Sequence, residues 1–302
     1  DGDAIAFVRS VDGKPQIHVL SLLGGEAVVV TDEANGASSP QFAPDGSRIL
    51  YASSRTEADL SRATGDDLPF RERSRYARSS ASPDPDSSLA QVQAYLDSSS
   101  ADGQARVIDR LDFQGEMDLS EGLSFRHLFV TDADGSGEPQ LVAGGWRSYG
   151  GGAWLPEGDG IVVSAAPGAE RDGDLRMHPD RIETSALYVA REGRLSLLAQ
   201  ADSVSFYAPA PAPDGSAVAF LTSDLREAGF GQTEIGVVSL EDGEVVGTAF
   251  PGGGMARNLT GGFDRSAGDI RWSPSSRYVY FTAPSNGGFP LYRVAPFGAF
   301  YD

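Results

Sequence analysis

Residues 37–51 read Ala-Ser-Ser-Pro-Gln-Phe-Ala-Pro-Asp-Gly-Ser-Arg-Ile-Leu-Tyr, and this stretch decides the fold because its central part recurs along the chain. Proline sets φ at the first corner of a turn and glycine accepts a positive φ, so Pro44-Asp45-Gly46 predicts a hairpin turn. The same turn recurs in four further places, one of them degraded and one at the start of the chain: Pro156-Glu157-Gly158, Pro213-Asp214-Gly215, Pro274-Ser275-Ser276 and Asp1-Gly2.

Each turn leads, at the same offset, into an apolar run that is rich in β-branched and aromatic residues, which predicts a strand. These first strands are expected at Ile5–Val8, Ile49–Tyr51, Ile161–Val163, Val218–Phe220 and Val279–Phe281. A second strand follows each of them, at Ile17–Val19, Leu128–Val130, Leu187–Val189, Ile235–Val237 and Leu291–Arg293. Aromatic residues stand two positions before three of the prolines, at Phe42, Trp154 and Trp272. Repeated hairpin halves of this kind are typical of the blades of a β-propeller.

The predicted fold class is therefore all-β: a β-propeller of four-stranded antiparallel blades. One blade cannot bury both of its faces alone, and stacking blades around an axis buries the faces against each other. The chain is expected to hold about five to six blades, as a single partial propeller domain over residues 1–302. A β-sandwich with irregular spacing is the alternative, and five copies of one turn in register with one strand argue against it.

An irregular insert interrupts the repeat at residues 55–103. It is rich in Ser, Asp and Arg and has almost no β-branched residues. Within it, apolar residues at helical spacing behind Ser88 predict a short helix over Ser88–Leu96. Long loops on rigid scaffolds often carry function, but a tolerated surface insertion is the simpler interpretation.

Composition excludes several classes of function. The net charge is −19 and the sequence pI is about 4.4, so no basic surface is expected to attract nucleic acid or anionic lipid. There is no cysteine, which excludes disulfides and thiolate chemistry. No apolar run is long enough to span a membrane and no signal sequence is visible, so a cytoplasmic location is favoured over a periplasmic or secreted one. Lys14 is the single lysine, which fits either high-GC coding bias or adaptation to high salt.

No self-sufficient active site is visible. The motif G-x-S-x-G, which marks the nucleophile of α/β-hydrolases, does not occur in the sequence. The three histidines lack metal-ligand spacing, and strand positions account for two of them; they are His18, His127 and His178. Asp132-Ala133-Asp134-Gly135 is interpreted as a hairpin turn rather than a calcium loop, because the terminal Glu ligand is missing. The glycine cluster Gly150–Gly152 lacks the Lys-Ser/Thr of a phosphate loop. No cofactor or metal is predicted.

The Pro-Asp-Gly stretch at 37–49 resembles the propeller repeats of TolB-like proteins and of the prolyl oligopeptidase family. Two further segments are similar to the acylaminoacyl-peptidase and dipeptidyl-peptidase branch of that family. They are Arg110–Phe113 with Arg126–Gly135, and Arg257–Pro274 with Pro290–Val294. The resemblance covers the chain apart from the insert.

The resemblance implies a seven-bladed propeller that precedes an α/β-hydrolase domain with a Ser-Asp-His triad. The hydrolase domain of the same parent chain and short peptide substrates would then be the partners, and the propeller would admit only small peptides. No triad position falls in this sequence, so no catalytic residue is assigned. A missing blade before Asp1 and closing strands after Asp302 are expected, and open strand edges make oligomers possible. The alternatives are a TolB-like or stand-alone protein-binding propeller and a propeller glycosidase.

If the parent is an aminopeptidase, the resemblance also implies an anion for the free amino terminus of the substrate, because an unpaired buried charge is costly. The acidic cluster Asp112, Glu116 and Asp118, in the irregular stretch before the Leu128 strand, is the candidate substrate-binding site. A solvated acidic loop is the competing interpretation.

Overall fold

The computed structural model describes residues 2–65, 82–101, 124–169, 184–227, 231–240 and 256–296. The chain divides into two compact units. The first comprises residues 1–55, 125–177 and 182–302, and the second comprises residues 56–124 and 178–181. Among the described residues, no helix has the length and apolar character needed to cross a membrane.

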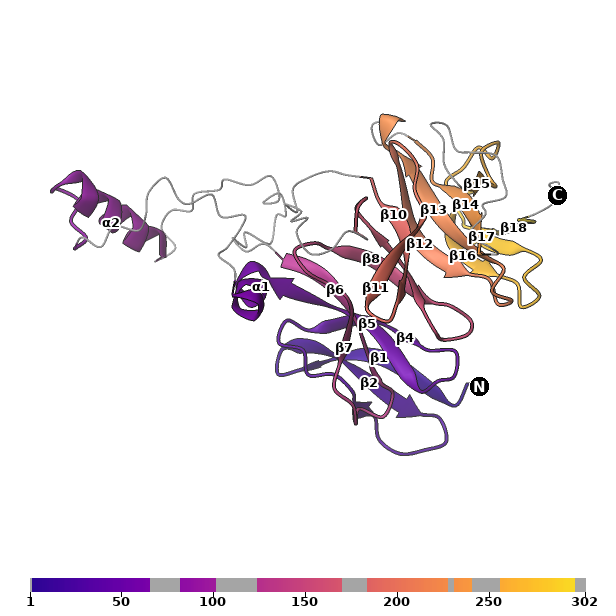
Figure 1. Ribbon diagram of the computed structural model, residues 1–302, viewed down its shortest axis with the longest axis horizontal. Coiled ribbons are helices and arrows are strands. Elements are labelled where there is room, and N and C mark those ends of the chain that lie inside the picture. The colour runs from indigo at the N-terminus through magenta and orange to yellow at the C-terminus, as the bar shows by residue number, and fades with distance from the viewer. Residues whose placement is uncertain are drawn as a thin grey trace. The chain divides into compact units, whose positions relative to one another are not determined.

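The first unit is built from five antiparallel sheets that follow one another in chain order, within the part of the chain that the structure describes (Figure 1). Sheet 1 holds β1 (Ala4–Val11), β2 (Lys14–Ser21) and β3 (Val28–Val29). Sheet 2 holds β4 (Ala37–Phe42), β5 (Arg48–Thr56), β6 (Ser124–Asp132) and β7 (Gln140–Ala143). Sheet 3 holds β8 (Tyr149–Trp154), β9 (Ile161–Ala165), β10 (Ala186–Arg191) and β11 (Arg194–Ala199).

Sheet 4 holds β12 (Val204–Pro211), β13 (Ala217–Asp224), β14 (Glu234–Ser239) and β15 (Arg257–Asn258), with the 3₁₀ helix η2 (Leu225–Glu227) after β13. Sheet 5 holds β16 (Gly268–Trp272), β17 (Val279–Thr282) and β18 (Leu291–Val294). All ten strand segments that the repeat predicts lie within these strands. The prediction of four strands per blade holds for sheets 2, 3 and 4, and sheets 1 and 5 have three described strands each.

The repeated turns form as predicted. The Gly46 amide donates to the Ala43 carbonyl at 2.9 Å, and Gly46 has φ +73°. In the degraded turn, Ser276 occupies the glycine position with φ +55°, which is strained for a side chain. The Ser276 hydroxyl accepts a 3.1 Å hydrogen bond from the Asp214 amide in the turn of sheet 4. That bond links the degraded turn of sheet 5 to the turn of sheet 4.

The core lies between consecutive sheets, in the contacts that we call seams. In sheets 2 and 5, two neighbouring strands carry a cross-strand pair of aromatic side chains that faces the preceding sheet. Tyr51 and Phe129 stack at 5.6 Å between ring centroids and pack with Ile17 of sheet 1. Phe281 and Tyr292 repeat the arrangement in sheet 5 at 5.5 Å. Four clusters of this kind join sheets 1 to 5 in order, so burial between blades is what holds the first unit together.

The second unit contains α1 (Glu57–Thr64) and α2 (Leu89–Ala101) among its described residues. The predicted helix behind Ser88 is confirmed, and it extends five residues beyond Leu96. The sequence analysis missed α1. Thr56 and Asp59 form a reciprocal capping box at its start and Gly65 ends it with φ +73°, so the signal was present in the sequence.

Candidate functional site

The acidic cluster predicted from the resemblance, Asp112, Glu116 and Asp118, lies outside the described residues, as does His178. Those assignments stay predictions.

The other two histidines are buried in strands, as expected from the repeat. His18 on β2 stacks on Phe7 at 5.6 Å between ring centroids. His127 on β6 lies 2.8 Å from the Gly145 carbonyl through Nε2, and burial lowers the pKa of His127 from its ordinary value of 6.5. Both side chains are packed and partnered inside the fold. Their role is structural.

The Asp-Ala-Asp-Gly segment is a hairpin turn between β6 and β7, as predicted. The Asp134 carboxylate accepts a 2.9 Å hydrogen bond from the Ser136 amide, and its hydrogen bonds with Ser136 lower the pKa of Asp134. Within the described ranges, no group of three or more acidic or histidine side chains is arranged to hold a metal ion.

The first strands of sheets 2 to 5 carry the most regular feature that the sequence analysis did not identify. We call them the inner strands, because β12 contacts both β8 and β16. Pairing with the following strand shifts register near the middle of each inner strand, which is a β-bulge. Three bulge residues that are not glycine have a positive φ, and all three are exposed: Ser39 (+56°), Ala208 (+48°) and Asp269 (+49°).

These bulges recur at one place in the repeat, five residues before the turn proline. Gly151 occupies the same place in β8. Bulges and positive φ at residues other than glycine are found preferentially at functional edges of sheets. The exposed side chains here are small or polar. The inner strands therefore present a narrow, hydrophilic edge that is fixed from behind by the buried seams.

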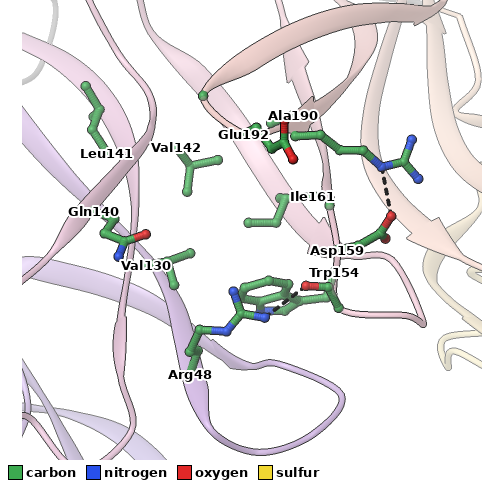
Figure 2. Close-up of a pocket in the computed structure, with 14 residues that line it drawn as sticks. Arg48, Val130, Gln140, Leu141, Val142, Trp154, Asp159, Ile161, Ala190 and Glu192 are labelled. Atoms are coloured by element: carbon green, nitrogen blue, oxygen red, sulfur yellow. Dashed lines mark hydrogen bonds and ion pairs between the residues drawn. The ribbon is translucent and has the colours of Figure 1, made fainter. Parts of the chain in front are cut away.

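A second feature is a pocket of about 150 Å³ between sheets 2 and 3, on the side of the Pro-Asp-Gly turns. Figure 2 shows Val130, Val142 and Ile161 around the same space, with Trp154 and Arg48 at its lower side. The Arg48 guanidinium lies 4.9 Å from the centroid of the Trp154 ring and donates a 2.9 Å hydrogen bond to the Gly158 carbonyl. This turn-face pocket is therefore lined both by apolar side chains and by polar and charged groups.

Two of the charged groups at the turn-face pocket form an ion pair. Arg191 donates through Nε to the Asp159 carboxylate at 3.1 Å (Figure 2). No histidine, and no serine with a base beside it, lines the pocket. Its lining residues therefore supply no nucleophile with a base beside it for bond cleavage.

A third feature is a buried carboxylate that sequence reasoning missed. Glu33, in the connection between β3 and β4, accepts a 2.7 Å hydrogen bond from the Tyr51 hydroxyl and forms a 2.8 Å ion pair with Arg55. Gln16 clamps the Glu33 backbone, donating to its carbonyl at 2.8 Å and accepting from its amide at 3.0 Å. Burial, and then the bond to Glu33, raise the pKa of Tyr51. The network fixes the seam between sheets 1 and 2.

The fold agrees with solved β-propellers over nearly the whole chain. Acylaminoacyl peptidase in complex with Z-Gly-Gly-Phe-chloromethyl ketone matches with a TM-score of 0.54 and 19% identity, over 97% of this chain and 36% of that one. TolB from Acinetobacter baumannii matches with 0.52 and 13%, over 97% and 49% of the two chains. The β-propeller domain of the Trilobed protease from Pyrococcus furiosus matches with 0.52 and 13%, over 97% and 63%.

The likeness confirms the predicted β-propeller fold, which peptidases and TolB proteins share. The chain spans between about a third and two thirds of the length of these structures. No protein-family model matches the sequence. No curated protein matches it either.

Proposed function

We propose that this chain is the non-catalytic propeller domain of a serine peptidase of the prolyl oligopeptidase type. In this proposal it gates the access of small peptides to a hydrolase domain that is not part of the sequence. The observation that carries the proposal is the match over 97% of the chain to only 36% of acylaminoacyl peptidase. The sequence itself supplies no nucleophile elbow, so the chemistry has to come from elsewhere.

The inner strands support the gating part of the proposal. A filter that selects by size needs a rigid edge that does not itself bind tightly. Ser39, Ala208 and Asp269 present small groups from backbone that is locked by bulges and by the seams behind them. Peptides would pass along this edge, and large folded chains would be excluded.

The gating proposal is tested in the full-length parent. Because the chain has no cysteine, Ala208→Cys creates a unique label site on β12, within this chain. Cysteine tolerates the positive φ there about as well as alanine does. A bulky maleimide at this site should lower kcat/KM for a tetrapeptide substrate much more than for a small ester. Ser196→Cys on β11 is the matched control, and its label should change neither rate. An equal effect of the two labels would contradict gating.

A protein-binding propeller of the TolB type is the second candidate, because TolB matches this fold nearly as well as the peptidase does. The parent reading frame separates the two. A G-x-S-x-G motif after Asp302 supports the peptidase, and a frame that closes without one supports the binding module.

A further inference from the structure

Position 126 belongs to a repeated element of the seams. Arg126 stands two residues before Leu128 on β6. Ser185 and Thr233 stand two residues before Leu187 on β10 and Ile235 on β14, so the three positions are equivalent. The backbone amide of each donates a 3.2 Å hydrogen bond to a serine hydroxyl at the start of the next sheet. The accepting residues are Ser148, Ser205 and Ser266, respectively. The backbone amide of Arg126 thus makes the same hydrogen bond as its equivalents in sheets 3 and 4.

The Arg126 side chain departs from the repeat. At the equivalent place, the Ser185 hydroxyl makes one short bond, donating to the Phe206 carbonyl at 2.8 Å. The Arg126 guanidinium instead reaches two inner strands. Its Nη1 donates to the Tyr149 carbonyl at 3.2 Å and to the Gly150 carbonyl at 2.6 Å, both on β8. Its Nη2 donates to the Ser39 hydroxyl on β4 at 3.3 Å. A cation therefore sits at the inner edge where a small hydroxyl would complete the seam.

The charge of Arg126 is not compensated by the described part of the protein. Arg55, Arg191 and Arg226 each pair with a carboxylate, whereas Arg126 forms no ion pair with any described residue. Arg126 is partly buried, and burial lowers its pKa. A desolvated cation without an anion is costly, so a site of this kind favours an anionic ligand.

The hydrogen bonds of Arg126 leave one edge of the guanidinium unused. A guanidinium has five N–H donors, and three hydrogen bonds use Nη1 twice and Nη2 once. The Nε–H and the second Nη2–H donate to no described residue. A carboxylate that approaches the Nε side of a guanidinium is bound by Nε–H together with an Nη2–H, and both nitrogens of Arg126 have an N–H to offer.

One position of β8 near these hydrogen bonds is open, whereas its neighbour is filled: a Cβ at Gly150 would lie 2.0 Å from the Ser164 hydroxyl oxygen. Gly150 and Gly151, part of the cluster noted in the sequence, are on β8 next to the carbonyls that hold Arg126. A Cβ at Gly151 would have no atom within 4 Å, and Gly151 does not have a positive φ. The backbone thus does not require glycine there. The other inner strands place Ser39, Ala208 or Asp269 at this position, so among the four only β8, whose carbonyls accept from Arg126, has glycine there.

We propose that Arg126, together with the Gly150–Gly151 backbone, forms a carboxylate subsite on the inner edge of the propeller. Its ligand is the C-terminal carboxylate of a short peptide, and this choice of ligand rests on the proposed function. An internal source of the same chemistry is the predicted acidic cluster Asp112, Glu116 and Asp118, which lies outside the described residues.

The subsite is tested by titrating this chain, in a calorimeter, with Ala-Ala-Phe and with its C-terminal amide. The acid should bind about tenfold more tightly than the amide, since a bidentate charge-assisted contact distinguishes them. Arg126→Gln should abolish the difference, and Arg126→Lys should keep part of it because the charge remains without the fork. Ser185→Ala is the matched control for a lost seam bond and should keep the full difference. Gly151→Leu should weaken binding of both peptides by filling the open space.

Equal affinities for acid and amide, absence of binding, or a difference that survives in Arg126→Gln would overturn the proposal. If the acid and the amide differ in affinity only in the triple variant D112N/E116Q/D118N, a carboxylate of the chain itself occupies Arg126 in the native protein. That result would overturn the peptide subsite. Binding is measured here without a hydrolase domain. Failure of gating in the labelled parent would therefore leave this result intact, and a negative titration would leave gating intact.

Discussion

The indole Nε1–H of Trp272 donates a 2.7 Å hydrogen bond to the carbonyl oxygen of Ala210, and so ties the inner strand of sheet 5 to that of sheet 4. Trp154 makes the same contact with the Gln41 carbonyl at 3.2 Å, and so ties the inner strand of sheet 3 to that of sheet 2. Both tryptophans stand two residues before a turn proline. The two tryptophans of the repeat thus fasten neighbouring blades.

Replacing Trp272 with Phe should lower the free energy of unfolding by about 1–3 kcal/mol, because the Ala210 carbonyl loses its donor in a partly buried seam. Urea denaturation followed by circular dichroism measures the change. Phe42 holds the same repeat position without a donor, so Phe42→Leu is the control for loss of ring volume alone. Unchanged stability in Trp272→Phe would show that the bond contributes nothing.

Replacing Gly236 with Ala should destabilise the chain by about 1–3 kcal/mol, since this change overpacks a filled core. A Cβ at Gly236 would lie 2.3 Å from the Phe220 ring, which occupies the space of the missing side chain. Gly151→Ala is the matched control, because Gly151 is also in a strand and its added Cβ would meet no atom within 4 Å. Equal melting temperatures for the two variants would contradict the packing that we describe.

Replacing Glu33 with Gln should cost about 3–5 kcal/mol, because Arg55 would lose the buried anion with which it forms a 2.8 Å ion pair. Tyr51→Phe removes only one hydrogen bond of the same network and should cost about 1 kcal/mol. Chemical denaturation of both variants gives the comparison. A loss in Glu33→Gln no larger than that in Tyr51→Phe would mean that the ion pair is dispensable.

The strands of the fold were predictable because each carries a local signal that tertiary packing reinforces. Pro44-Asp45-Gly46 sets the turn, and Ile49–Tyr51 supplies an apolar strand at a fixed offset. The pairing of a large side chain on one strand with a glycine on its neighbour was not predictable in the same way. Phe220 fills the space above Gly236, and only the register between β13 and β14 shows that the two residues are opposite each other.

The candidate site was harder to predict, because its residues are distant in sequence and ordinary in type. Arg126 meets Ser39 across 87 positions, and nothing in the sequence around either residue marks the contact. Glu33 is one of 43 acidic residues, and its burial follows from the seam between sheets 1 and 2. One signal was available: aligning the second strands of the repeat on Leu128, Leu187 and Ile235 places Arg126 where sheets 3 and 4 have Ser185 and Thr233.

The stability of the fold should fall as the pH drops below about 6.5, in part because of His127. Burial lowers the pKa of His127 in the folded state, so the unfolded chain binds a proton at a higher pH than the folded chain does. The stabilisation is complete above the unfolded value and is lost as the pH falls through the folded one. Gln is the informative replacement, since its amide can donate to the Gly145 carbonyl, 2.8 Å from Nε2 in the native chain, without titrating.

Urea midpoints measured from pH 7.5 down to 5 in the native chain and in His127→Gln test this directly. The native chain should lose stability more steeply over that range, because the two chains differ in no titratable group other than His127. Parallel curves would show that His127 does not contribute to the acid sensitivity of the fold.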